Sequence, residues 1–389
     1  MSDGIGSADC SRRGFLRRFT LGAGAAALFP LFSCDANPGG KGGKYFKSWE
    51  RSEALPDAEK LGVALVGLGS YATYQLGPAL QHTKFCRLTG IVTGTPEKKD
   101  QWYRRYAIPE EHAYSYETFD RIVNDPAIDI IYIVLPNGMH AEYTIRAAEA
   151  GKHVICEKPM ATSVADAEAM VAACRVNNRK LSLGYRLYFE PHHEKVMRLG
   201  RDEIFGPVRE MRGDFSFRIG ENPDVWRLDK ELAGGGPLMD VGIYAVQAAI
   251  YTVGTLPVAV TAKEETVNRE LFSEVEESIA WELEFPGELR AHGASSYSRG
   301  ANIHHAAASD GWFELEPAYG YSVVRGRMSE GELEFPRVNQ QALQMDAFAD
   351  HILNGAENRV PGEMGLRDTK ILYAIYEAAE TGKRVALEL

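Results

Sequence analysis

The chain has 389 residues, which is enough for two compact domains. Its hydrophobic content of 45% and its charged content of 25% are those of an ordinary globular protein. The formal net charge of -11 argues against a nucleic-acid partner, because such a partner is held by positive side chains that displace cations from its phosphates. It argues equally against a polybasic patch for a membrane surface.

Residues 1–34 have the pattern of an export signal. The adjacent Arg12 and Arg13 precede Gly-Phe-Leu, and the short apolar segment LGAGAAALFPLF follows. The paired arginines resemble the signal read by the twin-arginine export machinery, which carries folded proteins; a general export signal is the alternative. Cys34 is a candidate lipidation site, although the bulky Phe32 departs from that motif. We therefore expect an exported, periplasmic protein, with a lipid anchor at Cys34 as an open alternative.

The remaining chain divides into an arm and two domains. Residues 35–60 are rich in Gly, Lys and Ser and predict a linker or N-terminal arm. From Leu61 the buried strand segments GVALVGLG, IDIIYIVLP, HVICEKP and KLSLGYR alternate with helical segments, which predicts an α/β domain with a parallel sheet over 61–185. Residues 186–389 are β-rich with alternating polarity, which predicts an α+β substrate and oligomerisation domain with an antiparallel sheet. Its last helix, DTKILYAIYEAAETG, is a candidate for packing back on the first domain.

A glycine-rich turn follows the first predicted strand. In GLGSYA, Gly67 suits a tight turn, Gly69 lets the backbone approach a pyrophosphate, and Ala72 permits close packing of helix on strand. The strand-turn-helix context makes this a dinucleotide-binding fingerprint of the Rossmann type.

The end of the second strand reads TGTPEKK and indicates the kind of dinucleotide. An acid at this position would bind the ribose hydroxyls of NAD, and none is present. Thr93 and Thr95 offer hydroxyls, and Lys98 or Lys99 offers positive charge, which favours the 2′-phosphate of NADP. The alternative is that these lysines are solvated.

Two further strand ends carry polar residues. LPN ends the third buried strand, and Asn137 is expected to cap the helix that begins near Met139. EKP ends the fourth, and Lys158 is expected to face the nicotinamide crevice, held in an extended turn by the proline that follows. The cysteines form no CxxC spacing and no ligand pattern with histidine, so neither a disulfide framework nor a metal site is predicted.

Four segments resemble the Gfo/Idh/MocA oxidoreductase family: GLGSYA, LPNGMHAEYTIRAAEAGKHVICEKPMATSVADA, LGYRLYFEP and WRLDKELAGGGPLMDVGIY. The resemblance runs from about Leu61 to about Val385 and is greatest to the glucose–fructose oxidoreductase branch, whose members are exported and use NADP. It implies a Rossmann domain followed by a largely antiparallel open-faced sheet, whose exposed face packs in homo-oligomers (dimers or tetramers). It also implies Lys158 and Tyr244 as the catalytic pair.

The resemblance implies cofactor contacts along much of the chain. They are Gly67, Leu68, Gly69, Ser70, Tyr71, Thr93, Lys98, Leu135, Pro136, Asn137, His140, Glu157, Lys158, Arg186, Trp226, Arg227 and Tyr321.

The segment AGGGPLMDVGIY is the predicted catalytic edge of the second domain. Its glycines are expected to bring a loop close to the nicotinamide and the sugar, and Pro237 to start a helix. Asp240 and Tyr244 stand four apart on that helix and so share a face. We expect Tyr244 to exchange a proton with the sugar, Lys158 and the nicotinamide ring to favour its phenolate, and Asp240 to position the sugar or Lys158. Tyr185 and Tyr188 are candidates for lining the sugar site.

These features predict an NADP-dependent sugar oxidoreductase acting on carbohydrates. Oxidation of an aldose at C1 to the lactone, with reduction of a second sugar through a tightly held cofactor, is the leading interpretation. A dehydrogenase that releases NADPH, an NAD(P)-dependent glycosidase and a non-catalytic dinucleotide-binding sensor remain alternatives.

Overall fold

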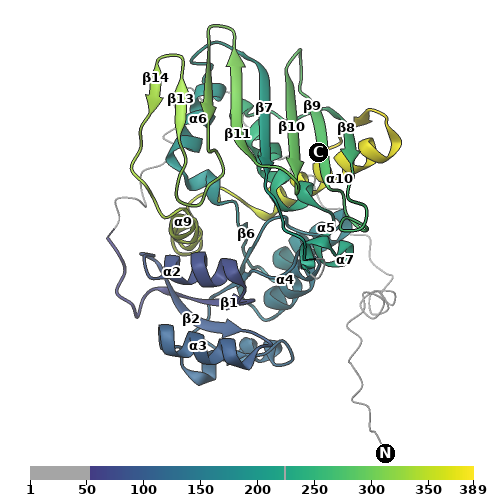
Figure 1. The fold of residues 1–389 in the computed structure, drawn as a ribbon. Helices are drawn as coiled ribbons and strands as arrows, with labels where there is room; N and C mark the ends of the chain where they lie inside the picture. Colours follow the sequence, from purple (N-terminus) through teal and green to yellow (C-terminus); the bar gives the residue numbers. More distant parts are fainter. Residues whose placement is uncertain (1–52, 223–224) are drawn as a thin grey trace, which may run out of the picture. The chain divides into compact units, whose positions relative to one another are not determined.

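The computed structural model describes residues 53–222 and 225–389, which belong to one compact unit, Ser48–Leu389 (Figure 1). The twin-arginine pair, Cys34 and most of the predicted arm lie outside the described residues. Among the described helices none has the length and apolar content that crossing a membrane requires. Within the same residues, no group of three or more His, Cys, Asp or Glu side chains is placed to hold a metal ion.

The first domain is built on a parallel sheet. Its six strands in the described chain run in the order β3-β2-β1-β4-β5-β6, and every neighbouring pair is parallel. The strands are β1 Leu61–Val66, β2 Cys86–Val92, β3 Ala113–Tyr114, β4 Ile130–Ile133, β5 His153–Cys156 and β6 Leu181–Leu183. The helices between them are α2 Gly77–Leu80, α3 Pro96–Tyr106, α4 His140–Glu149 and α5 Val164–Val176. β1 and β4 are almost completely buried, as expected of central strands with helices on both faces.

The second domain is built on a larger, mostly antiparallel sheet. Over the described residues its nine strands run in the order β14-β13-β12-β11-β7-β10-β9-β8-β15, and only β7 and β10 pair in parallel. The strands are β7 Val208–Ser216, β8 Ala259–Glu265, β9 Ser278–Glu284, β10 Arg290–Ser296, β11 Ala301–Ala308, β12 Gly311–Leu315, β13 Gly326–Met328, β14 Gly331–Leu333 and β15 Val385–Ala386. The helices are α6 Pro191–Arg201, α7 Lys230–Ala233, α8 Ile243–Val253, α9 Gln340–Asn354 and α10 Gly362–Thr381. The predicted fold class, a Rossmann domain followed by a largely antiparallel sheet, is confirmed.

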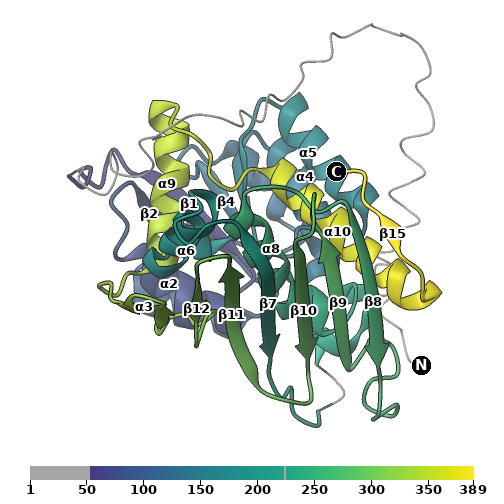
Figure 2. The same cartoon turned by 90° about the horizontal axis from the view of Figure 1, so that it is seen from above.

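Helix α8 packs on one face of this sheet. This packing explains why buried and exposed side chains alternate along the strands. On β9, Ile279, Trp281 and Leu283 are buried, while the residues between them are partly or fully exposed. Trp281 lies so close to β10 that a Cβ on Gly293 would stand 2.0 Å from its ring. In Figure 2 the strands lie in front of α6, α8 and α10, so these helices share one side of the sheet.

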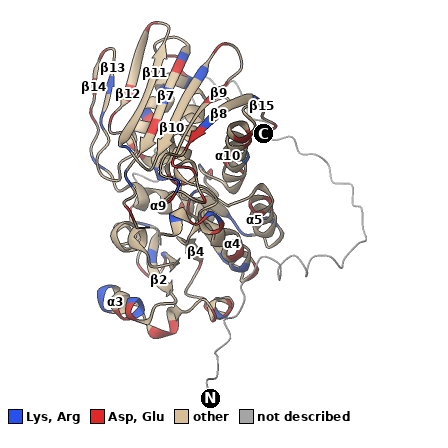
Figure 3. Cartoon of the chain, turned by 45° about the vertical axis from the view of Figure 1, so that its right-hand side comes forward, with Lys and Arg blue, Asp and Glu red and all other residues tan. Residues whose placement is uncertain are grey.

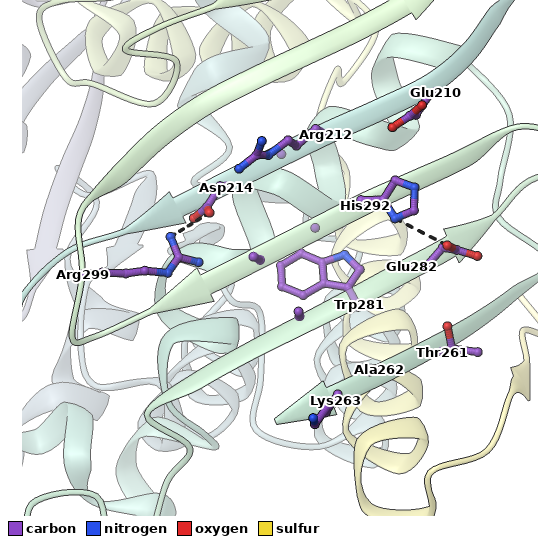
Figure 4. A pocket seen from close by; sticks show the side chains of 14 residues that line it. Glu210, Arg212, Asp214, Thr261, Ala262, Lys263, Trp281, Glu282, His292 and Arg299 are labelled. Atoms are coloured by element: carbon purple, nitrogen blue, oxygen red, sulfur yellow. Dashed lines mark hydrogen bonds and ion pairs between the residues drawn. The ribbon is translucent and has the colours of Figure 1, made fainter. Parts of the chain in front are cut away.

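The other face of the sheet is polar. Basic and acidic residues are interspersed on its strands (Figure 3). A shallow hollow there is lined by residues that include Arg212, Glu282 and His292, and Arg299 pairs with Asp214 at 2.7 Å (Figure 4). Its lining contains none of the predicted site residues, and the prediction that this face packs in oligomers stays a prediction.

The C-terminal helices contact the first domain. On α9, the Asp346 carboxylate accepts hydrogen bonds from the backbone N–H groups of Lys84 and Phe85, which precede β2. Helix α10 packs against α5, and the Leu183 N–H on β6 donates to the Val360 carbonyl before α10 begins. The chain therefore returns to the Rossmann domain after completing the second sheet.

Candidate active site

The predicted nucleotide turn has the expected backbone. Gly67 has φ +95°, and a Cβ there would lie 2.7 Å from the Val134 carbonyl oxygen and 2.8 Å from a Leu135 methyl carbon. A Cβ on Gly69 would meet no atom within 4 Å, so this backbone is open to a ligand. Leu68 is buried, whereas Ser70 is exposed where the helix begins. The backbone conformation therefore requires glycine at position 67. Glycine at position 69 leaves the backbone accessible to a ligand.

The sequence did not decide whether Lys98 or Lys99 would bind the 2′-phosphate, and their surroundings after β2 differ. Lys99 pairs with Glu110 at 3.4 Å, whereas Lys98 is partly buried and has no acidic partner among the described residues. Thr93 is buried, and its hydroxyl oxygen accepts from the Thr95 N–H at 3.2 Å. Lys98 is therefore the better placed of the two for a phosphate.

The side chains of Asn137 and His140 make hydrogen bonds with backbone carbonyl groups. The Asn137 amide nitrogen donates to the Ala233 carbonyl (2.8 Å), and Asn137 caps no helix, because it lies within a short 3-10 helix, Asn137–Met139, and the residue before α4 is Met139. His140 is fully buried, and its ring nitrogens face the carbonyl oxygens of Leu135 and Pro159, each at 2.9 Å. It therefore joins two loops of the site and offers no free nitrogen to a cofactor. Pro136, between Leu135 and Asn137, is partly buried in the same loop.

Glu157 is held inside the Rossmann domain. The Tyr132 hydroxyl donates to it at 2.7 Å, and the Gln344 amide on α9 in turn donates to that hydroxyl at 2.8 Å. Burial raises the pKa of Glu157, and Tyr132 and Lys158 oppose the shift. A side chain at Gly184 would collide with this carboxylate, at 2.5 Å.

Asp240 is the centre of a charged cluster at the domain boundary. Lys158 Nζ donates to the Asp240 carbonyl oxygen (2.5 Å) and lies 3.5 Å from Oδ1, while Arg227 Nε donates to Oδ2 at 2.8 Å. The Tyr297 hydroxyl also donates to Oδ2, at 3.2 Å. Burial acts to raise the pKa of Asp240, but Lys158 and Arg227 outweigh it, and the pKa is lowered. Asp240 thus contacts Lys158 through its carbonyl oxygen and its carboxylate, and its role in positioning Lys158 stays a prediction. Arg227 also lies over the Trp226 ring, 4.5 Å from its centroid.

Tyr244 lies between two cations. Lys158 Nζ is 5.0 Å and Arg186 Cζ 5.1 Å from the centroid of its ring. The buried Arg186 guanidinium donates to the carbonyl oxygens of Tyr319 (2.7 Å) and Gly320 (3.0 Å) and to the Gln340 amide (2.5 Å). The position of Arg186 is therefore fixed by the loop of residues 316–321 (EPAYGY) and by α9.

The expected lowering of the Tyr244 pKa by Lys158 is not what the structure shows. Burial raises that pKa, and Arg186 is the foremost group that opposes the shift. Tyr244 is 5% exposed, so the loss of hydration outweighs the nearby positive charges. The protein alone therefore holds Tyr244 as a neutral phenol.

A row of ring and cation contacts connects the nucleotide turn with Tyr244. Tyr71, in the GLGSYA turn at the start of the helix, has its ring centroid 5.5 Å from that of Tyr321. Arg186 lies 4.3 Å from the Tyr321 centroid and continues to Tyr244 and Lys158. Five segments that are distant in the sequence meet in this row.

Tyr185 and Tyr188 lie in the core and not at the site. They are 1% and 6% exposed, and their rings stack with centroids 6.2 Å apart. Burial raises the pKa of both, and their nearest charges are Arg367 and Asp368 on α10. The structure therefore gives no support to the interpretation as sugar-lining residues, because the charged neighbours that both rings share lie on α10.

The glycine loop before Asp240 also differs from expectation. Pro237 has helical angles (φ -61°, ψ -25°) and opens the helix as predicted, but the next turn, Leu238–Gly242, is a π-helix. Two of the glycines lie against protein groups: a Cβ on Gly235 would lie 2.0 Å from the Tyr376 hydroxyl, and one on Gly236 2.3 Å from the Glu276 carbonyl oxygen. Tyr297 and Glu276 are the residues here that sequence reasoning missed. Each lies far along the chain from the motifs, and no spacing points to it.

Comparison with known proteins settles the family. Residues 61–185 match the oxidoreductase family with an NAD-binding Rossmann fold, and residues 193–314 match the GFO/IDH/MocA C-terminal domain. The chain belongs to the Gfo/Idh/MocA family. The resemblance drawn from the four sequence segments is thereby confirmed, and the chain is an oxidoreductase of this family.

Three similar proteins have names that point to sugars. The crystal structure of aldose-aldose oxidoreductase from Caulobacter crescentus, complexed with glycerol, is 45% identical and has a TM-score of 0.82, covering 84% of this chain and 100% of its own. D-xylose 1-dehydrogenase [NADP(+)] from Haloarcula marismortui is 32% identical over 356 residues, which are 89% of this chain and 98% of that protein. D-xylose 1-dehydrogenase (NADP(+)) 2 from Haloferax volcanii is 31% identical over 70% of this chain and 85% of its own.

Proposed function

We propose that the protein is an NADP-dependent sugar oxidoreductase that oxidises an aldose at C1 to the lactone, with Tyr244 as the acid/base. The observation that carries this proposal is the row of contacts from Tyr71 through Arg186 to Tyr244 and Lys158, because it joins the nucleotide turn to a proton-transfer group. The names of the relatives support the choice of substrate class and of NADP.

The residues at the nucleotide turn fit a dinucleotide. The backbone at Gly69 is open, and Lys98 and Thr93 stand at the end of the neighbouring strand, where a 2′-phosphate would lie. When bound, the nicotinamide accepts the hydride from C1 of the sugar. In this proposal the carbon lies beside Tyr244 and Lys158, at the far end of the row of contacts from the nucleotide turn.

Tyr244 and its neighbours then account for the proton. In oxidation the C1 hydroxyl loses its proton to the Tyr244 phenolate as the C1 hydride leaves, and the C1–O bond becomes the lactone carbonyl. In the reverse direction neutral Tyr244 returns the proton to a carbonyl. Arg186, beside the ring, opposes the effect of burial on the Tyr244 pKa, and a bound oxidised nicotinamide, which carries a positive charge, would favour the phenolate further. Asp240 holds Lys158 in place.

The proposal includes reduction of a second sugar through a retained cofactor. The named activity of the Caulobacter relative supports it, since two aldoses appear in that name. Export would support it as well, because little free NADP exists outside the cytoplasm. Periplasmic location is itself proposed on the signal at residues 1–34 alone.

The test begins with the purified exported protein and its absorbance spectrum. We expect bound NADP, and we expect a panel of aldoses to produce the absorbance of reduced nicotinamide. Reduction that persists until a second sugar arrives would support transfer, whereas release of NADPH would identify a plain dehydrogenase. Glycoside cleavage without net reduction would overturn the proposal in favour of a glycosidase.

Lys98 is expected to set the preference for NADP. The Lys98→Ala variant should bind NADP about tenfold to a hundredfold more weakly, because one charge-assisted contact to the 2′-phosphate is lost. Its affinity for NAD should be unchanged. Fluorescence titration with both dinucleotides measures this, and Lys99→Ala is the matched control because Lys99 already pairs with Glu110. Equal weakening for both dinucleotides would contradict the assignment.

A further inference from the structure

The glycine loop leads into the helix that carries Asp240 and Tyr244, and a buried carboxylate holds its start. Glu276, in the segment before β9, is 6% exposed. Its Oε2 accepts from the Gly236 N–H at 2.8 Å, and its Oε1 accepts from the Leu238 N–H at 3.1 Å. The first N–H groups of a helix have no partner inside the helix, so an acceptor from elsewhere stabilises this end.

Helix α10 fixes Glu276 from the other side. The Tyr376 hydroxyl donates to Glu276 Oε1 at 2.9 Å. One turn earlier on α10, the Tyr373 hydroxyl donates to the Thr162 carbonyl, next to which Gly234 packs. The C-terminal helix thus reaches the glycine loop through two tyrosines on one face.

The three glycines are explained by this arrangement. Gly234 has φ +79° and ends α7, and a Cβ there would lie 2.7 Å from a Thr162 methyl carbon. Gly235 leaves room for the Tyr376 hydroxyl. A Cβ on Gly236 would stand 2.3 Å from the Glu276 carbonyl oxygen and 3.0 Å from its carboxylate. The loop therefore has no side chains so that Glu276 and Tyr376 can reach its backbone.

A short path leads from this contact to the catalytic cluster. The Gly236 N–H binds Glu276, and the Gly236 carbonyl accepts the Asp240 N–H at 3.2 Å. The Asp240 carbonyl in turn accepts from Lys158 Nζ. A shift of the loop would therefore move both groups that bind Lys158, the Asp240 carbonyl and its carboxylate.

We propose that Glu276, supported by Tyr376, is a positioning residue for the catalytic helix: it sets the place of Asp240 and Tyr244 without touching the substrate. We call Glu276 and Tyr376 the loop anchor. This rests on the proposed function for what Asp240 and Tyr244 do, but not for how they are held. The anchor borders a hollow of the surface lined by residues that include Gly235, Tyr376 and the exposed Glu377. Water from this hollow can reach the loop amides when the carboxylate is lost, so the variants should fold.

The test compares Glu276→Gln, Tyr376→Phe and the control Glu377→Gln. The control removes a carboxylate from the same hollow, and its side chain does not belong to the anchor. For Glu276→Gln we expect kcat for aldose oxidation to fall by about tenfold to a hundredfold, because small displacements of catalytic groups have effects of this size. The kcat of Tyr376→Phe should lie between that of the wild type and that of Glu276→Gln. NADP affinity should be unchanged in all of them, and each kcat is expressed per NADP-binding site.

Hydrogen exchange supplies a readout that is independent of turnover. The amides of the 234–246 segment should exchange faster in Glu276→Gln than in wild type and at the wild-type rate in Glu377→Gln. Faster exchange with unchanged kcat per binding site would overturn the positioning role, because Glu276 would then be only structural. Unchanged exchange would overturn the anchor itself. If the wild-type protein oxidises no aldose, the proposed function fails, while faster exchange confined to this segment would still establish the anchor.

Discussion

The Tyr244→Phe variant is expected to oxidise aldoses about a hundredfold to ten-thousandfold more slowly than the wild-type protein, which is the usual contribution of a positioned acid/base group. The ring contacts with Arg186 and Lys158 need no hydroxyl, so the shape of the site and NADP affinity should persist. Steady-state kinetics with a fluorescence titration of NADP would separate the two effects. The loss should appear in kcat and not in cofactor binding.

The matched control for this variant is Tyr143→Phe. Tyr143 is also a buried tyrosine, but it lies on α4 and packs against Phe119 in the Rossmann domain. It should keep wild-type turnover. Near-normal activity of Tyr244→Phe, or equal losses in both variants, would contradict the role of Tyr244 as the acid/base.

Asp240→Asn is expected to have the second largest effect, on activity and on stability together. The neutral amide would leave Lys158 and Arg227 without their counter-charge, and Lys158 would lose its fixed position near Tyr244. We expect kcat to fall about a hundredfold. We also expect the free energy of unfolding to fall by about 2 kcal/mol, less than for a fully buried pair because Arg227 is partly exposed. Kinetics and denaturant unfolding measure the two effects.

The stability effect of Asp240→Asn should depend on pH. The pKa of Asp240 in the folded protein is lowered from its ordinary value by Lys158 and Arg227, which outweigh burial. Its charge therefore stabilises the fold fully above about pH 4, and this stabilisation is lost as the pH falls through the folded-state pKa. The difference in melting temperature between wild type and variant should narrow below about pH 4. A difference that stays constant or widens there would show that the lost charge is not its cause.

Much of the site follows from local sequence. Gly67, Lys158, Asp240 and Tyr244 each lie at a position that strand or helix pattern fixes, namely a strand end or the first turns of a helix. Carboxyl ends of parallel strands meet at one edge of a sheet, so Gly67 and Lys158 converge without knowledge of distant contacts. That Asp240 and Tyr244 face this edge is implied by the family resemblance. The fold class could be predicted for the same reason, since alternation and helix periodicity are local properties.

The remaining features depend on contacts between distant segments. Asn137 and His140 look available in the sequence, but backbone carbonyl groups that only the folded chain brings near take up their polar atoms. Tyr185 is equally ambiguous, because its direction depends on where α10 packs. The raised pKa of Tyr244 comes from burial, which no spacing of charges reveals. Glu276 has no local signal at all, and its partners are 38 to 100 residues away.

The central claim is that hydride passes from C1 of an aldose to the nicotinamide while Tyr244 takes the proton. The most direct test is to supply the purified full chain with NADP and an aldose deuterated at C1, and to analyse the cofactor by mass spectrometry. We predict that the reduced cofactor carries the deuterium, that oxidation is slower with the labelled sugar, and that Tyr244→Phe forms almost no labelled cofactor. Consumption of the sugar with no deuterium in the cofactor would contradict this mechanism.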